Sequence, residues 1–200
     1  MAQGTFGYPV FLDVSGVSVL VVGGGAVAFR KASGLFDAGA IVTIVAMEIG
    51  DELAPLFAAI ATTIEVRPYR NGEATDYQLV MTATDDPAVN AQVAADARGA
   101  RVWANSADDP DNCSFILPAV ARRGLVTVAV STGGASPALA SRLRNDIADR
   151  ELTAEVEAAA IELARQRAEI HATGASTEDI DWAPRLESAL KRIKPLDPPN

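Results

Sequence analysis

The feature that most constrains this 200-residue chain is a glycine turn set between a β-rich run and a helical pattern. Residues 17–22 read Val-Ser-Val-Leu-Val-Val, and three glycines follow directly. Gly23, Gly25 and Ala28 fill the small-residue positions of the G-x-G-x-x-G/A fingerprint, in which a strand turns tightly into a helix that faces a dinucleotide pyrophosphate. A helix that begins at Ala26 would direct its unpaired N–H groups at the phosphates. We therefore predict a dinucleotide site, in preference to a tight turn that binds nothing.

Composition favours a globular chain of one large domain or one and a half. Hydrophobic residues make up 49% of the sequence and charged residues 22%, which is sufficient for a packed core. The net charge of -9 argues against nucleic acid and anionic membranes as partners. The longest apolar run is broken by glycines and no charged segment precedes an apolar one at the start, so we expect neither a signal peptide nor a membrane span. We expect a cytoplasmic protein.

The order of predicted elements indicates a doubly wound α/β fold of Rossmann type. Apolar β-rich runs alternate with helical patterns, as in a parallel sheet covered by helices. The predicted strands are 17–22, 41–46, 64–67, 79–83 and 101–104, and the predicted helices are 26–38, 49–61 and 87–98. The strand at 79–83 shows no alternation of polar residues, as expected where both faces are buried. We assign residues 1–112 to this nucleotide-binding domain.

The pattern changes from Cys113 onward. Two apolar runs, 115–121 and 125–131, are separated by Arg122-Arg123-Gly124 and predict a β-hairpin. A two-stranded ribbon is marginal alone, so we expect it to pack on another layer or pair with a second copy in a homodimer. Predicted helices follow at 136–150, where Ser136 precedes Pro137, at 153–170 and at 182–193, with a linker at 172–181 and a disordered proline-rich tail. We divide this part into a hairpin-and-helix segment, 113–150, and a small C-terminal helical region, 151–200.

Polar residues at two predicted strand ends are candidates for contact with the nucleotide. Ligands of open α/β sheets lie beyond the carboxyl ends of the strands, which makes Ala83 and Thr84 cofactor-facing candidates. Glu48 follows the second strand, where an acidic residue accepts the ribose hydroxyls of NAD, and no arginine is its sequence neighbour. An equal alternative is that Glu48 complements the dipole of the next helix. We expect Asp86 to be an N-cap before Pro87.

An aspartate-rich segment follows the last predicted strand of the sheet. Asp108, Asp109 and Asp111 lie where a substrate would meet the cofactor, and one of them is a candidate general base. On residue types alone, a solvated Asp-Pro turn is the better explanation. A hard-metal site is an open alternative, although the segment lacks the full ligand spacing of a calcium loop. With one histidine, His171, and one cysteine, Cys113, the chain has no soft-metal cage, and we predict no resident metal.

A second turn has the composition of an anion site. Ser131, Thr132, Gly133 and Gly134 place two hydroxyls and two glycines just before a predicted helix N-terminus. Such a turn could hold the carboxylates of a substrate, and an ordinary N-capped turn is an equal alternative. We expect Cys113 to be a small, buried apolar residue and His171 to lie at the end of a helix, with no catalytic role for either.

Five motifs occur together in one order. They are Leu-Val-Val-Gly-Gly-Gly-Ala-Val-Ala-Phe-Arg-Lys at 20–31, Ala-Thr-Asp-Asp at 83–86 with Asn90, Asp-Asp-Pro at 108–110, Cys-Ser-Phe-Ile-Leu-Pro at 113–118 and Ser-Thr-Gly-Gly-Ala-Ser-Pro at 131–137. In this order they resemble the precorrin-2 dehydrogenase and sirohydrochlorin ferrochelatase family, which includes the N-terminal half of siroheme synthase. The resemblance spans residues 8–150.

The resemblance implies an enzyme that oxidises precorrin-2 to sirohydrochlorin with NAD, and in some members inserts ferrous iron to give siroheme. It implies that Asp108 is the catalytic aspartate. It places the cofactor contacts on the turn from Gly23 through Val27 and on Met47 and Glu48. Ser131 and Thr132 match a hydroxyl-rich loop that lines the active cleft, and the hairpin matches a dimerisation segment. A chain of this length is then expected to lack the methyltransferase half.

Two other functions are compared with this one, and the sequence excludes the first of them. A short-chain dehydrogenase needs a tyrosine followed four residues later by lysine, and the residues four after Tyr8, Tyr69 and Tyr77 are Leu12, Glu73 and Met81, so that class is excluded. A regulatory module that senses NAD without catalysis would need neither an acidic residue beside the substrate nor a second anion turn.

Overall fold

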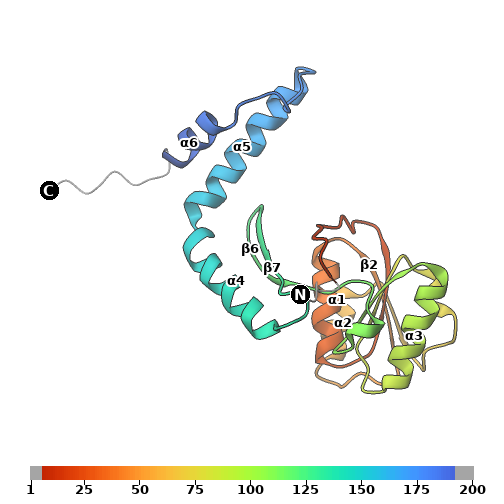
Figure 1. Ribbon diagram of the computed structural model, residues 1–200. Helices are drawn as coiled ribbons and strands as arrows, with labels where there is room; N and C mark the ends of the chain where they lie inside the picture. Colours follow the sequence, from red (N-terminus) through yellow and green to blue (C-terminus); the bar gives the residue numbers. More distant parts are fainter. Residues whose placement is uncertain (1–5, 192–200) are drawn as a thin grey trace. The chain divides into compact units, whose positions relative to one another are not determined.

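The computed structural model describes residues 6–191 (Figure 1). Within that range the chain divides into two compact units, which meet in the sequence between Ile116 and Leu117. Unit 1 contains β1 (Ser18–Val22), α1 (Ala26–Asp37), β2 (Ile41–Ala46), α2 (Ala54–Ile60), β3 (Thr63–Val66), the 3-10 turn η1 (Glu73–Asp76), β4 (Leu79–Thr82), α3 (Pro87–Ala100), β5 (Trp103–Ser106) and the 3-10 turn η2 (Pro110–Asn112). Unit 2 contains β6 (Ala119–Arg123), β7 (Val126–Val130), α4 (Pro137–Glu151), α5 (Ala154–Ala172) and α6 (Ala183–Lys191).

Unit 1 is built on a five-stranded parallel sheet. Its strand order is β3-β2-β1-β4-β5, and every neighbouring pair is parallel. The chain runs outward from β1 to β3 and then returns to the other side of β1 with β4, so the order reverses between β1 and β4. In Figure 1, α1 and α2 lie on one side of this sheet and α3 on the other. The predicted doubly wound α/β fold is confirmed.

Burial on both faces explains why these strands carry no polar alternation. In β1, Val19 and Val21 pack with α1 and α2, whereas Leu20 and Val22 pack with α3 on the opposite face. All four side chains are buried. Because burial of a valine or leucine side chain stabilises a fold by roughly 1.5–3 kcal/mol, a polar residue at any of these positions would be costly.

The C-terminus of α1 is closed by a glycine. Gly39 has a left-handed φ of 85°, and its N–H donates to Phe36 O at 2.8 Å while that of Ala40 donates to Leu35 O at 3.0 Å. This pair of bonds is a Schellman motif, which satisfies the last carbonyls of the helix and sends the chain directly into β2.

Two predicted boundaries in unit 1 are wrong. The helix expected over 49–61 covers only Ala54–Ile60, because a turn over 51–53 precedes it. The strand expected over 101–104 is Trp103–Ser106, because α3 continues to Ala100 and Arg101 ends it in the left-handed conformation, with φ 61°. The last strand of the sheet therefore ends two residues later than predicted.

Unit 2 begins with the predicted β-hairpin, but its turn is displaced. Arg123 pairs with Val126, so the turn consists of Gly124 and Leu125 rather than Arg122-Arg123-Gly124. Gly124 has φ 52°, and glycine at the first position of a two-residue turn is typical of type II′ hairpins. A Cβ at Gly124 would also lie 2.6 Å from a carboxylate oxygen of Glu157, so a larger residue there would displace that side chain.

Helix α4 packs on this hairpin within unit 2. Arg144 of α4 donates from Nη1 to Val120 O at 2.8 Å. Ser136 caps the helix by accepting from Leu139 N at 3.2 Å, with Pro137 at the first helical position, as predicted. His171 lies in the last turn of α5, also as predicted. The proline-rich tail lies outside the described residues, and no helix of the described part is long and apolar enough to cross a membrane.

Candidate functional site

A cavity of about 710 Å³ opens at the carboxyl edge of the sheet in unit 1. The residues that follow β1, β2 and β4 form its walls, together with the segment after β3 and the first turns of α3. Its lining includes Gly23, Gly24, Gly25, Met47, Glu48, Arg67, Tyr69, Asn71, Ala83, Thr84, Asp85, Val89 and Gln92. The cavity therefore lies where the strand order reverses, which is the ligand position in open α/β sheets, and its volume is within the roughly 300–1,000 Å³ of small-ligand sites.

The three glycines of the turn have different reasons to be glycine. Gly23 has φ 131°, and a Cβ there would lie 2.4 Å from Ala83 O. A Cβ on Gly24 would lie 2.1 Å from Glu48 O. At Gly25 a Cβ would meet nothing within 4 Å, so no protein atom requires glycine at this position. Gly25 keeps open space beside the helix, as a ligand that approaches the backbone needs.

Helix α1 begins without a side-chain cap. Gly25 is its N-cap, no side chain of the described residues accepts from its first turn, and that turn carries no acidic residue. The helices α3, α4 and α5 are capped by Asp86, Ser136 and Thr153. The N–H groups of the first turn, which include those of Ala26 and Val27, have no intrahelical acceptor and are available to an anion. Neither residue lines the cavity itself; both follow Gly25, which does.

Asn90 fixes the loop between β4 and α3 that forms one wall of the cavity. Its amide donates to Thr84 O at 2.9 Å, and its Oδ1 accepts from Thr84 N at 3.2 Å and from the hydroxyl of Thr82. The side chain is buried. Asp86 accepts from the N–H groups of the first turn of α3, which confirms its predicted role as an N-cap. Ala83 and Thr84, both predicted to face the cofactor, line the cavity.

Met47 and Glu48 follow β2 and line the same cavity. Both side chains are exposed, and they lie beside the glycine turn because Gly23 N donates to Val45 O at 2.9 Å. Arg67, which was not among the predicted site residues, lines the cavity from the end of the neighbouring strand β3. A signal for it existed, since Arg67 is the last residue of the strand predicted over 64–67 and ligands lie at the carboxyl ends of such strands.

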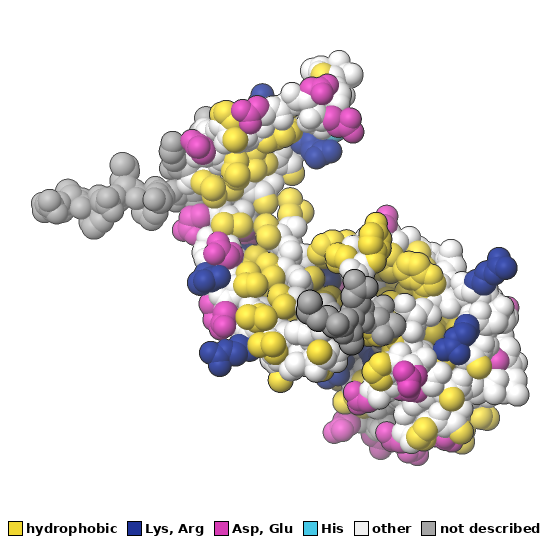
Figure 2. All heavy atoms as spheres, viewed as in Figure 1, with side chains coloured by type: hydrophobic (Ala, Val, Ile, Leu, Met, Phe, Trp, Pro, Cys, Tyr) yellow, Lys and Arg dark blue, Asp and Glu magenta, His cyan; other side chains and the backbone are white. Residues whose placement is uncertain are grey.

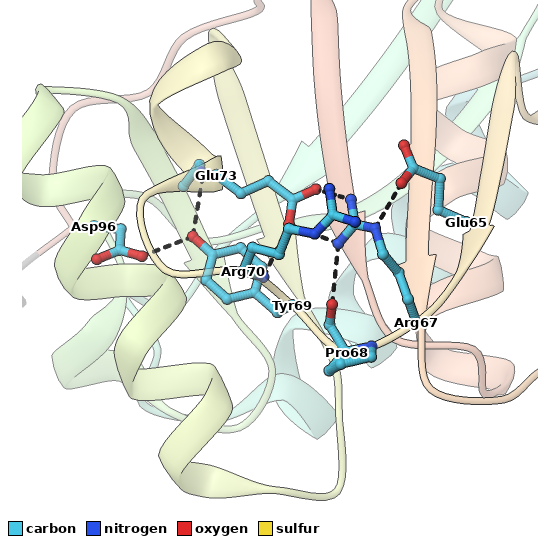
Figure 3. A network of polar contacts seen from close by, with 8 residues as sticks. Glu65, Arg67, Pro68, Tyr69, Arg70, Glu73 and Asp96 are labelled. Atoms are coloured by element: carbon cyan, nitrogen blue, oxygen red, sulfur yellow. Dashed lines mark hydrogen bonds and ion pairs between the residues drawn. The ribbon is translucent and has the colours of Figure 1, made fainter.

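Figure 3 shows that Arg67 belongs to a polar network on the segment after β3. Its guanidinium donates to Glu73 through Nη1 at 2.9 Å and through Nη2, and its Nε donates to Glu65 at 2.6 Å. Nη1 also donates to Pro68 O at 3.0 Å. These hydrogen bonds, that to Glu73 first, raise the pKa of Arg67. Burial alone would raise the pKa of Glu73, but the bonds from Arg67 lower it.

A second set of bonds secures the same segment to α3 (Figure 3). The hydroxyl of Tyr69 donates to Asp96 Oδ2 at 2.9 Å and accepts from Ala74 N at 3.0 Å. Gly72 N donates to the same Asp96 oxygen at 2.7 Å. Burial would raise the pKa of Asp96, but these hydrogen bonds lower it below its usual value. The segment is thus fixed at both ends by carboxylates that accept backbone and side-chain donors.

Asp108 lies beyond the end of β5 and is not among the residues that line the cavity. Its side chain is exposed, and its φ of 55° places it in the left-handed region. Among non-glycine residues of the described range, only Arg101 shares a positive φ. A non-glycine residue held in that region costs on the order of 1–3 kcal/mol and often marks a functional loop.

A buried polar network supports the loop that carries Asp108. Lys31, on α1, donates from Nζ to Asn105 Oδ1, and Asn105 Nδ2 donates to Phe115 O at 2.9 Å. Burial lowers the pKa of Lys31, while the nearby Cys113 and Asp108 act to raise it. Lys31 is the last residue of the motif at 20–31, and no role was predicted for it.

Cys113 belongs to the same network and is only partly exposed. Its sulfur accepts from Ser106 N at 3.2 Å and lies 3.3 Å from Asp109 O, to which the thiol donates. Burial raises the pKa of this thiol, which keeps it protonated at neutral pH and unsuited to act as a nucleophile. No group of three acidic, histidine or cysteine side chains in the described residues is arranged to hold a metal ion.

The hydroxyl-rich turn belongs to unit 2. Gly133 N donates to Ser131 Oγ at 3.1 Å, and Ser136 N donates to Thr132 Oγ1 at 2.9 Å. Gly133 and Gly134 have left-handed φ values of 64° and 88°. The turn therefore needs glycine for its backbone conformation, and its hydroxyls make the local bonds of an N-capped turn.

Two family models match successive parts of the chain. A family described as "Putative NAD(P)-binding" matches residues 10–119, and a family described as "Sirohaem biosynthesis protein central" matches residues 123–150. The first match covers more than half of the chain. The chain belongs to this family of putative NAD(P)-binding proteins. The resemblance drawn from the five motifs is confirmed.

Three curated proteins named siroheme synthase are 43–45% identical to this chain over the aligned residues. The siroheme synthase of Tolumonas auensis is 44% identical over 136 residues, and that of Pseudomonas putida strain W619 is 45% identical over 136 residues. That of Methylococcus capsulatus is 43% identical over 139 residues. The alignments cover 68–70% of this chain but only 29% of the length of these relatives.

A solved structure extends the likeness over nearly the whole chain. SirC, described as a precorrin-2 dehydrogenase, superposes with a TM-score of 0.68 at 27% identity, over 93% of this chain and 89% of that one. The likeness to siroheme synthases and to SirC is therefore seen in sequence and in fold, and the NAD(P)-binding family implies a nicotinamide cofactor of the NAD(P) type.

Proposed function

We propose that this protein oxidises precorrin-2 to sirohydrochlorin with NAD as the hydride acceptor. The observation that carries the proposal is the glycine turn before α1, where Gly25 leaves open space beside uncapped N–H groups at a cavity of about 710 Å³. The relatives named siroheme synthase and precorrin-2 dehydrogenase support the choice of substrate.

In the reaction a C–H bond of the reduced tetrapyrrole breaks. Its electron pair leaves as hydride to the nicotinamide ring of NAD, which is the chemistry that the cofactor supplies, and a proton leaves from the substrate. We assign Asp108 as the base that accepts this proton, because it is an exposed carboxylate in a strained loop that follows the neighbouring strand of the sheet. The hydrogen bond from Lys31 to Asn105 fixes the end of β5, from which this loop begins.

The turn from Ser131 to Gly134 is our candidate for binding the substrate's carboxylates. A Cβ at Gly134 would meet nothing within 4 Å, so the backbone at this glycine is open to a ligand, as an anion-binding turn needs. This role needs only backbone donors, so the local use of the hydroxyls does not compete with it. Iron insertion stays a prediction of the family resemblance, with ferrous iron as a substrate.

We infer that NAD is preferred over NADP. Glu48 follows β2, where a carboxylate pairs with the ribose hydroxyls of NAD and repels a 2′-phosphate. Of the described residues that line the cavity, Glu48, Asp85 and Asp86 are acidic and only Arg67 is basic. The surroundings are therefore unfavourable to an additional phosphate.

We also propose a homodimer in the cytoplasm. The two strands of the hairpin pair with each other and, within the described residues, with no other strand. Figure 2 shows hydrophobic side chains at the surface of the unit 2 helices, and Leu139, Leu143 and Ile161 are among those exposed. Such surfaces favour association of two copies. The single cysteine suits a reducing compartment.

The test is turnover of purified protein with precorrin-2 and NAD, followed by NADH absorbance. The proposal predicts NADH formation that requires both reactants and is lost in Asp108→Asn. Retained NAD binding without turnover on precorrin-2 would instead favour the alternative of a nucleotide-sensing module. Subsequent addition of ferrous iron, with a siroheme spectrum as readout, tests the second reaction separately.

A further inference from the structure

Arg67 is placed to contact a bound nucleotide, but its donors are already used. It lines the cavity and its side chain is only 16% exposed. Two of its nitrogens bond the two oxygens of Glu73, and Nε bonds Glu65. Glu73 is only 11% exposed in its side chain, so this pair is shielded from water on both sides. Shielded, bidentate arginine–carboxylate pairs are among the stronger polar contacts in proteins.

The position of Arg67 is adjacent to that of Glu48. The strands β2 and β3 are in parallel register, with Ala46 opposite Val66. Arg67 N donates to Ala46 O at 2.8 Å. Arg67, the first residue after β3, therefore lies beside the end of β2, two residues before Glu48. Glu48 occupies the position at which Rossmann proteins contact the adenosine ribose, and proteins that accept NADP have an arginine nearby that pairs with the 2′-phosphate.

The Glu73 carboxylate that holds Arg67 is itself fixed. Glu73 Oε2 accepts from Arg70 N at 3.0 Å, which fixes the carboxylate at the start of η1. The η1 segment is anchored to α3 through Asp96, which accepts from Tyr69 and Gly72. Arg67 cannot turn into the cavity without breaking a bidentate ion pair whose acceptor does not move with it.

We propose that Glu65 and Glu73 form a clamp that withholds Arg67 from the nucleotide and so makes the site selective against a 2′-phosphate. The proposal rests on the dinucleotide site proposed above. The clamp acts in two ways. It occupies the two N–H groups that would otherwise bind a phosphate in the same bidentate geometry. It also changes the local charge from +1 for Arg67 alone to −1 for Arg67, Glu65 and Glu73 together.

The test compares NAD and NADP binding, by titration calorimetry, in wild type and in Glu73→Gln. Glutamine keeps the size of the side chain but removes its charge, which frees Arg67 to pair with phosphate. We expect NADP to bind about tenfold more tightly relative to NAD, as expected for one gained charge-assisted contact. The double variant R67M/E73Q should lose this gain, since it depends on the guanidinium.

A matched control is Glu157→Gln, which removes a carboxylate from a different arginine pair, that with Arg123 in unit 2. It should leave the ratio of the two affinities unchanged. If E73Q does not fold, Glu65→Gln, whose side chain is 40% exposed, loosens the same clamp and should shift the ratio in the same direction by a smaller factor.

The outcomes separate this proposal from the enzymatic one, because binding is measured without turnover. An unchanged ratio in both glutamate variants, or a gain that persists in R67M/E73Q, would overturn the clamp. Failure of wild type to bind either nucleotide would overturn both. Nucleotide binding with the predicted ratio shift but no oxidation of precorrin-2 would leave the clamp intact and remove the proposed reaction alone.

Discussion

Substitution of Gly25 by alanine should separate nucleotide binding from folding. The backbone of Gly25 has φ −90° and ψ 179°, which any residue adopts, and the added Cβ would meet no protein atom within 4 Å. Alanine at a compatible glycine position stabilises a fold by about 0.4–1 kcal/mol, because the unfolded chain loses freedom. Gly25 is also the N-cap of α1, where alanine is less favourable than glycine, and this effect opposes the gain. We therefore expect the stability of G25A to lie within about 1 kcal/mol of wild type.

The same methyl group should weaken binding strongly. It occupies the space through which a pyrophosphate reaches the N–H groups of Ala26 and Val27 at the start of α1. Loss of one or two charged hydrogen bonds, at about 1.5–3 kcal/mol each, corresponds to an NAD affinity lower by about 10-fold to more than 10³-fold. Titration calorimetry with NAD measures the affinity, and urea unfolding measures the stability.

Gly34→Ala is the matched control. Gly34 lies in the same helix, is exposed, and a Cβ there also meets nothing within 4 Å. Alanine should raise helix stability by up to about 1 kcal/mol and leave NAD affinity unchanged. The reasoning is refuted if G25A binds NAD as tightly as wild type, or if it loses much more than about 1 kcal/mol of stability, since either result would mean that Gly25 serves the fold rather than a ligand.

Three further predictions follow from the site. Asp108→Asn should lower kcat by about 10²–10⁴-fold and leave the NAD affinity unchanged, because asparagine tolerates a left-handed φ but cannot accept the proton. An equal loss of nucleotide binding would contradict the assignment of Asp108 as the base. Lys31→Met removes the donor to Asn105 and should reduce kcat about tenfold while the NAD affinity stays within twofold of wild type, and an unaltered kcat would show that the network does not position the loop. Glu73 and Asp96 have lowered pKa values in the folded protein, so in acid the unfolded chain binds more protons than the folded chain. The free energy of unfolding should be constant above about pH 5 and fall as the pH drops below it, less steeply in E73Q. Urea unfolding at a series of pH values measures this.

Much of unit 1 could be predicted from sequence because local signals agree with the tertiary fold. The run at 19–22 is continuously apolar because β1 is buried on both faces, and Gly39 marks the helix end because only glycine takes that φ without cost. Asp86 before Pro87 gave the N-cap correctly for the same reason, since the cap involves only neighbouring residues.

The errors arise where tertiary contacts or backbone conformation override local pattern. Arg101 ends α3 in a left-handed conformation that no local preference of arginine predicts, so the start of β5 was placed too early. The hairpin turn was misplaced by one residue because both Arg123 and Gly124 are compatible with a turn, and pairing with Val126 decides between them.

The site was predicted only in part, for a similar reason. Gly24, Arg67 and Lys31 act through residues 24, 6 and 74 positions away, so no short motif reveals their partners. The glycine turn, by contrast, carries its function in the backbone, where sequence spacing is a sufficient guide. The roles of Asp108 and of the turn at 131–134 stay predictions.

The most direct test of the account is a crystal structure of the protein grown with NAD. The account predicts density for the pyrophosphate against the N–H groups of Ala26 and Val27, with the adenosine ribose beside Glu48. An empty cavity at saturating NAD, or a nucleotide bound elsewhere on the chain, would contradict it.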